Sequence, residues 1–104
     1  MATIIRGTTP TIRYTFSSVD VSDIDVAKLI IKQNGVSLIS KELSDATVGE
    51  TYLDWKLSQE DTFKLSKDLM AMVGLDWLLE DGTRGIGNSV LCSVCDPNYN
   101  QVIE

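Results

Sequence analysis

Residues 26–43 read VAKLIIKQNGVSLISKEL, two apolar stretches separated by the dipeptide Asn34-Gly35. Both central positions of a type I′ turn need a positive φ angle, which asparagine and glycine adopt at low cost. The stretch before the turn alternates lysines with an apolar face made of Ala27, Leu29 and Ile31. This alternation is typical of a half-buried strand, so residues 26–43 predict an antiparallel β-hairpin.

Alternation with a period of two continues on both sides of this hairpin. Residues 12–16 precede it, and residues 51–57 and 69–79 follow it, each with apolar side chains at every second position. Asp81-Gly82 predicts a second hairpin turn, after which the segment 87–94 returns as another strand. The chain therefore reads as a series of short strands joined by tight turns.

One segment breaks the alternation. In SQEDT, residues 58–62, Ser58 is followed three positions later by Asp61, the spacing of a capping box at the start of a helical turn. Calcium binding is the alternative for these polar groups, but calcium takes 6–8 oxygen ligands and consecutive side chains on a turn point apart. The segment predicts one short helical turn between strands.

These elements predict the fold class. About six or seven short strands with one short helical turn favour an all-β, antiparallel β-sandwich over an alternating β–α–β protein. An immunoglobulin-like arrangement is the leading hypothesis, although the Cys–Trp–Cys pattern of antibody domains is absent. A length of 104 residues suits a single domain, 1–104, in which Trp55 and Trp77 are both in phase with buried aliphatic residues.

Composition argues against two classes of partner. The net charge is −6 and there is no histidine, so the basic surface that neutralises nucleic-acid phosphates is not expected. The apolar runs are shorter than the roughly 20 residues that a membrane helix needs. The first residues, MATIIRG, lack the charged start and apolar core of a secretory signal, which predicts synthesis in the cytoplasm.

The two cysteines, Cys92 and Cys95, stand three positions apart. On a strand this spacing places them on opposite faces, which predicts two unconnected structural thiols. An intermolecular disulfide or a metal site completed by carboxylates is the alternative, but a zinc site needs about four ligands. We expect no metal and no cofactor.

Enzyme chemistry finds no support in the pattern. Without histidine, base catalysis would fall to carboxylates, lysines or thiols, and none stands in a triad or phosphate-loop setting. The glycine-rich stretch GTRGIGN, residues 82–88, follows a hairpin turn instead of opening a helix. We expect the protein not to be an enzyme.

Five stretches carry a family resemblance, and they span almost the whole chain: RGTTPT (6–11), LIIKQNG (29–35), KLSQEDTFKL (56–65), WLLEDGTR (77–84) and NSVLCSV (88–94). They resemble small phage and prophage proteins of Gram-positive bacteria. They are also similar to the N-terminal immunoglobulin-like domain of tailed-phage baseplate upper proteins, which attaches receptor-binding machinery to the tail. The resemblance implies a structural virion protein with other tail or baseplate proteins as partners, and no catalytic residues.

The expected contact residues come from two stretches. RGTTPT at 6–11 is either a strand entrance or an assembly contact, and the methionines beside Gly74 form a partner-binding strip or pack under a second sheet. The predicted partner contacts are Arg6, Thr8, Thr9, Met70 and Met72. Self-association through sheet edges is also expected, with residues 2–6 outside the core.

An alternative function is a binding module for a host-surface glycan or for another phage protein. Glycan sites commonly expose aromatic platforms, and with both tryptophans predicted in the core, the remaining aromatic candidates are Tyr14, Tyr52 and Tyr99.

Overall fold

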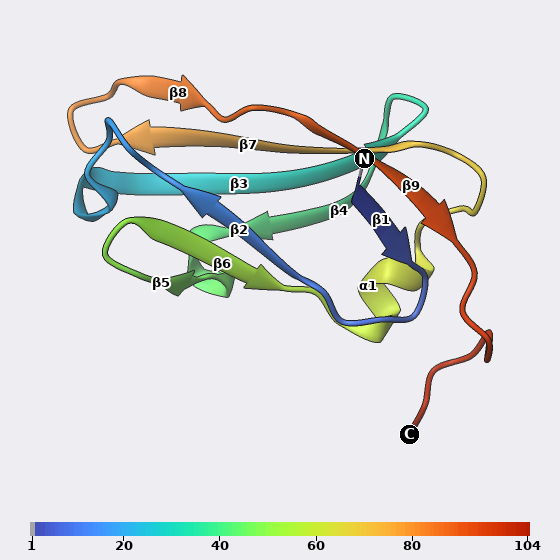
Figure 1. The fold of residues 1–104 in the computed structure, drawn as a ribbon. Coiled ribbons are helices and arrows are strands. Elements are labelled where there is room, and N and C mark those ends of the chain that lie inside the picture. Colours follow the sequence, from blue (N-terminus) through green and yellow to red (C-terminus); the bar gives the residue numbers. More distant parts are fainter. Residues whose placement is uncertain (1) are drawn as a thin grey trace.

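A computed structural model describes residues 2–104 as two packed β-sheets (Figure 1). The larger sheet has the strand order β1-β9-β7-β3-β4, with β8 paired to part of β7. Its strands are β1 (Ala2–Ile5), β3 (Ile24–Gln33), β4 (Val36–Glu42), β7 (Ala71–Leu79), β8 (Arg84–Ile86) and β9 (Val90–Cys95). The smaller sheet has the order β2-β6-β5, with β2 (Thr11–Thr15), β5 (Thr47–Val48) and β6 (Tyr52–Lys56).

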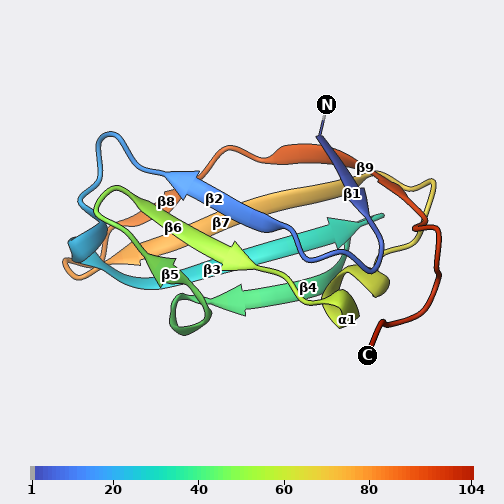
Figure 2. The same ribbon diagram turned by 60° about the horizontal axis from the view of Figure 1, so that its bottom comes forward.

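The smaller sheet covers one face of the larger one. Figure 2 shows β2 and β6 lying over the part of the larger sheet that β7 and β3 form. Three helical turns connect strands: η1 (Val21–Asp23), η2 (Leu43–Asp45) and α1 (Gln59–Phe63). This mostly-β architecture of two sheets is compatible with the predicted all-β sandwich, but the larger sheet is not wholly antiparallel, because β1 pairs parallel with β9.

The structure has more elements than the sequence predicted. Residues 2–104 form nine strands and three helical turns, whereas the sequence predicted about six or seven strands and one helical turn. The additional strands β1, β5 and β8 contain 4, 2 and 3 residues, which is too few for an alternating pattern to show. No helix among residues 2–104 is long and apolar enough to cross a membrane.

The central hairpin forms as predicted. Asn34 has φ 53° and Gly35 has φ 77°, the two positive values that a type I′ turn requires between β3 and β4. The second predicted turn also forms, with Gly82 at φ 89°, but it leads first into β8 and only then into β9. Both β8 and β9 pair antiparallel with β7.

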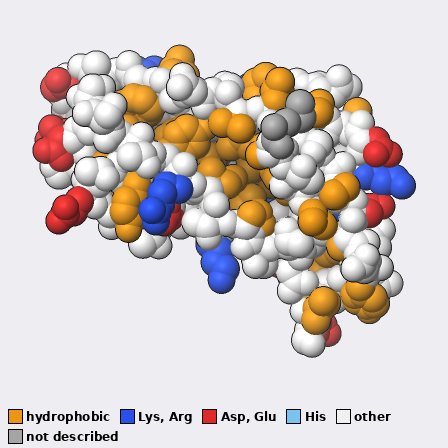
Figure 3. Space-filling view, viewed as in Figure 1, with side chains coloured by type: hydrophobic (Ala, Val, Ile, Leu, Met, Phe, Trp, Pro, Cys, Tyr) orange, Lys and Arg blue, Asp and Glu red, His pale blue; other side chains and the backbone are white. Residues whose placement is uncertain are grey.

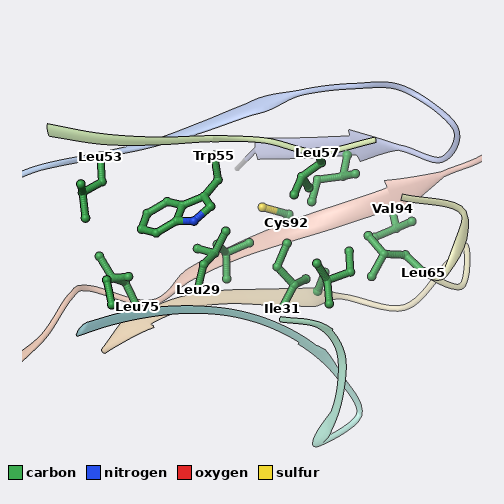
Figure 4. Packing of buried hydrophobic residues seen from close by; sticks show 14 of the residues in the cluster. Leu29, Ile31, Leu53, Trp55, Leu57, Leu65, Leu75, Cys92 and Val94 are labelled. Atoms are coloured by element: carbon green, nitrogen blue, oxygen red, sulfur yellow. The ribbon is translucent and has the colours of Figure 1, made fainter. Parts of the chain in front are cut away.

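The core lies between the two sheets. The larger sheet contributes Leu29, Ile31 and Leu75, and Trp55 enters from the smaller sheet between Leu53 and Leu57 (Figure 4). Trp55 is 1% exposed and its indole Nε1 donates a hydrogen bond to the carbonyl oxygen of Glu42 at 2.9 Å. The core prediction for Trp55 is confirmed.

Trp77 lies at the margin of this core. It is half-buried and packs edge-on against Phe16, with the ring centroids 5.1 Å apart. Its indole also covers Gly85 of β8, where an added Cβ would come within 2.3 Å of the ring. Trp77 therefore closes one end of the sandwich, and is less buried than its phase with Leu75 predicted.

The first strand belongs to the sandwich. β1 pairs parallel with β9, and Ile4 is buried in the core at 6% exposure. The expectation that residues 2–6 lie outside the core is therefore wrong. An isolated four-residue strand beside a polar loop gives no periodicity from which its partner, about 90 positions away, could be found.

Candidate functional site

The outer face of the larger sheet carries a groove with a volume of about 550 Å³. Because Leu29, Ile31 and Leu75 point into the core, the alternate positions of β3 and β7 point outward. Its aliphatic lining residues are Val26, Ile30, Met72 and Leu78. Its charged lining residues are Lys28, Lys32, Asp76 and Arg84.

Gly74 gives the groove its depth. It stands opposite Ile30 in the β3–β7 register, between the pairs Lys28–Asp76 and Lys32–Met72. A Cβ added to Gly74 would meet only the Ser89 Oγ, at 3.8 Å, so the space above this backbone is open. A glycine with room above it, in the middle of a nine-residue strand, leaves a hollow where a side chain would otherwise stand.

Exposed apolar side chains extend from the groove across the same face. Val26 is 37% exposed and Met72 is 44% exposed. Leu91 pairs with Met72 in the register, and Ile86 pairs with Asp76, so both share the outer face at 48% and 69% exposure. Exposed apolar side chains grouped on one face in this way are a feature of protein–protein contact sites.

The groove is locally basic although the chain is acidic. Three lysine or arginine side chains and one carboxylate line it, while the whole chain has a net charge of −6. Arg84 pairs with Asp76 at 2.5 Å and Lys28 pairs with Glu42 at 2.5 Å. Lys32 makes no ion pair within residues 2–104, so its charge is available to a partner.

One end of the sandwich is acidic. The loop before β3 and the turn between β7 and β8 meet there, because the Glu80 N–H donates to the carbonyl oxygen of Asp23 at 2.9 Å. Five exposed carboxylates gather at this end, which we name the acidic pole: Asp20, Asp23, Asp25, Glu80 and Asp81. Acidic side chains are visible at the left end of the molecule in Figure 3, where these two connections lie in Figure 1.

Two carboxylates of the acidic pole are held in their charged form. The Ser22 hydroxyl and backbone N–H donate to Asp20 and lower its pKa. Hydrogen bonding from Thr83 lowers the pKa of Asp81 in the same way. The acidic pole therefore keeps these charges in mildly acidic solution.

Arg6, one of the predicted contact residues, is engaged within the chain. Its Nε donates to the carbonyl oxygen of Leu65 at 2.7 Å, and its Nη1 forms an ion pair with Asp96 at 2.5 Å. The guanidinium also lies 5.3 Å from the centre of the Phe63 ring. These contacts fasten the end of β1 to the segment after α1 and to the residues that follow β9.

Thr8 and Thr9 are exposed in the link between β1 and β2. The Thr8 hydroxyl donates to the carbonyl oxygen of Ile5 at 2.6 Å, and the Thr8 carbonyl accepts a hydrogen bond from the Thr62 hydroxyl at 2.8 Å. Gly7 has φ 81°, and a Cβ there would lie 2.5 Å from the Phe63 ring. These contacts are those of a segment that leads the chain into β2, and the Thr9 side chain stays exposed.

Only one of the predicted contact residues lines the groove. Met72 lies there beside Gly74, whereas Met70, at 41% exposure, precedes β7 and is not a lining residue. Arg6, Thr8 and Thr9 do not line it either. The sequence prediction overlooked Ile30, whose signal is an apolar residue on a face otherwise marked by lysines.

Other predicted features have structural roles. Cys92 is buried and Cys95 is exposed, so the two free thiols lie on opposite faces as predicted, and burial raises the pKa of Cys92. Among residues 2–104 there is no group of three or more metal-ligating side chains.

The capping box at Ser58 also forms. Its backbone N–H donates to the Asp61 carboxylate at 3.0 Å, and the Asp61 N–H donates to the Ser58 hydroxyl. Lys41 of β4 pairs with the same carboxylate at 2.9 Å. Burial raises the pKa of Asp61, but the hydrogen bonds from Ser58 and Lys41 outweigh it, and the net pKa is lowered.

Comparisons of the chain with protein-family models, with curated proteins and with solved structures give no match. The groove, with its aliphatic floor and the Lys32 ammonium, is the main feature of the outer face of the larger sheet.

Proposed function

We propose that this chain is a non-enzymatic assembly or adaptor domain of a phage or prophage tail, placed in the baseplate region of the virion. The observation that carries the proposal is the groove on the outer face of the larger sheet. It combines an aliphatic floor with Lys32, which makes no ion pair within residues 2–104, and it is flanked by Ile86 and Leu91, which are 69% and 48% exposed. Such a surface fits a protein partner.

We further propose that the sandwich is immunoglobulin-like. If the strands are lettered in chain order with β2 as strand B, then β3, β4, β5, β6, β7 and β9 become strands C, C′, D, E, F and G. The larger sheet then contains C′, C, F and G as neighbours, and the smaller sheet contains B, E and D. This is the division of strands in variable-type immunoglobulin domains. The first strand, β1, joins the G side in parallel, and the β8 strand is an addition to the F–G connection.

The residues of the groove favour binding over catalysis. Asp76, its carboxylate, is paired with Arg84 at 2.5 Å, and the Lys28 ammonium is paired with Glu42. A general base needs a free lone pair within reach of a substrate proton, and an ion-paired carboxylate beside a guanidinium is poorly suited to that role.

Glycan binding is the alternative function. Of the three tyrosines, Tyr52 is half-buried with the Arg13 guanidinium 3.9 Å from its ring centre, and the Tyr14 ring packs toward Gly87. Tyr99 is 57% exposed but is not a groove residue. Trp77 also lines the groove, but its ring packs against Phe16 and covers Gly85. These side chains do not form a sugar-stacking platform, so we favour a protein partner.

The test is a binding assay with tail proteins encoded beside this chain, together with a search for the chain in purified particles by mass spectrometry. Met72→Asp places a charge in the groove and should weaken capture of the partner at least about tenfold. Val48→Asp is the matched control, because Val48 is 57% exposed on β5 of the other sheet. Absence from particles, together with equal capture by both variants, would refute the proposal, and a glycan array would then test the alternative.

A further inference from the structure

The charges around the groove select for an acidic partner. Three cations line the groove, of which Arg84 pairs with Asp76 and Lys28 pairs with Glu42 of β4, so Lys32 carries the charge left for a partner. Lys32 has no ion-pair partner within residues 2–104, and Arg84 has a side chain that is 70% exposed. The Lys32 ammonium attracts acidic groups that approach this face, although the chain as a whole has a net negative charge.

The same charges disfavour a symmetric contact between two grooves. A twofold axis through the groove would bring Lys32 and Arg84 of one copy toward the same residues of the other. Like charges brought together in an interface oppose association. A second copy would therefore have to offer a different surface to this groove.

The acidic pole is such a surface. Asp23, Asp25 and Glu80 project from the η1 turn, the start of β3 and the β7–β8 turn, and all three are exposed. The pole and the groove share the rigid strand β3, in which Asp25 directly precedes the lining residue Val26. Because both surfaces lie on one rigid strand, the acidic pole of a copy cannot fold back into its own groove.

We propose that the groove binds the acidic pole of a second copy of this chain, so that copies join head to tail. This inference rests on the proposed assembly function and names the partner of the groove. A contact between two different surfaces leaves each terminal copy with one free groove or one free acidic pole. Repetition of the contact therefore closes a ring or extends a filament.

The test compares three proteins by sedimentation velocity from micromolar to millimolar concentration at low salt. The groove variant is Lys32→Glu, and the pole variant combines Asp25→Asn with Glu80→Gln. Lys56→Glu makes the same charge change as the groove variant at an exposed position on β6. All of these side chains are exposed, and circular dichroism and thermal melts establish that each variant is folded.

Wild type and Lys56→Glu should form species larger than a dimer. Their association should weaken at least about tenfold when salt rises from roughly 0.05 to 0.5 M, because screening shortens the range of the attraction. The groove variant and the pole variant should each be monomeric alone. Their equimolar mixture should form a dimer and nothing larger, because only one intact groove and one intact acidic pole can meet.

Three results would overturn the inference: a monomeric wild type throughout, a pole variant that self-associates like wild type, or a mixture that stays monomeric. The first result does not decide the proposed function. A monomeric wild type that still captures a tail protein, with that capture lost in Met72→Asp, leaves the adaptor role standing and removes only the second copy as partner.

Discussion

Gln33 provides the most direct test of how the sandwich is held together. It is the last residue of β3, is 3% exposed, and faces the core side of the sheet. Its amide nitrogen donates to the carbonyl oxygens of Ser66 at 2.7 Å and Leu69 at 3.1 Å, and its oxygen accepts from the Ser66 N–H at 2.7 Å. One side chain thus satisfies three backbone groups in the loop before β7.

Gln33→Met keeps the length of the side chain and removes all three hydrogen bonds. An unsatisfied buried polar group costs about 1–3 kcal/mol, and water can reach part of this loop because Ser66 and Leu69 are exposed, so the lower end of that range applies. Three groups at roughly 1 kcal/mol each predict a loss of about 2–4 kcal/mol. Small domains have unfolding free energies of about 5–15 kcal/mol, so the loss is readily measured.

Urea unfolding, followed by tryptophan fluorescence, gives the free energy of unfolding for wild type and variant. Gln101→Met is the matched control, because Gln101 is exposed and accepts only one hydrogen bond, from the Tyr99 hydroxyl. The control should change stability by less than about 0.5 kcal/mol. If Gln33→Met falls within the same limit as the control, the reasoning about the loop is refuted.

Gln33→Glu adds a pH-dependent version of this test. A buried carboxylate at this position would face the carbonyl oxygens of Ser66 and Leu69, which disfavours its charged form and raises its pKa above the unfolded value of about 4.3. The variant should therefore be destabilised at neutral pH and should recover toward wild type as the pH falls through the raised pKa. A deficit that does not change with pH would contradict this account.

Three further predictions concern other parts of the domain. Trp55→Ala should cost about 3–5 kcal/mol in thermal or urea unfolding and Trp77→Ala clearly less, because Trp77 is only half-buried; equal losses would contradict this difference. Asp61→Asn should destabilise the domain at neutral pH, and the deficit should shrink only as the pH falls below the unfolded value of about 3.9 and through the lowered folded pKa, because a lowered pKa contributes stability that is lost over that range; a deficit that stays constant down to strongly acidic pH would argue against it. Cys95 should react with a thiol reagent in the native state and Cys92 only after unfolding, and two reactive thiols in native protein would disprove the burial of Cys92.

The hairpins and the alternating strands could be predicted from the sequence because their signals are local. Asn34-Gly35 specifies its own turn, and Trp55 is in phase with neighbours two positions away. The capping box at Ser58 and Asp61 is equally local, and it forms as expected. In each case the residues that determine the structure lie within a few positions of one another.

The remaining features depend on pairings between distant segments. The partner of β1 is β9, and the partners of Arg6 are Leu65 and Asp96, at separations of 59 and 90 residues that no periodicity encodes. The groove likewise needs the β3–β7 register, which places Ile30 opposite Gly74. The sequence singled out Met72 and Gly74, but it could not place Lys32 and Arg84 beside them.

The parallel pairing of β1 with β9 determines how the domain responds to mechanical tension. Ala2 lies beside Cys92 and Ile5 beside Cys95, so a force that draws Ala2 and Cys95 apart slides the two strands along each other. The backbone hydrogen bonds between them then resist together in shear, instead of opening one after another as in a peeled hairpin. The Thr3–Ser93 hydrogen bond and the Arg6–Asp96 ion pair resist the same force as these backbone hydrogen bonds. All of these interactions must break before the core comes under tension.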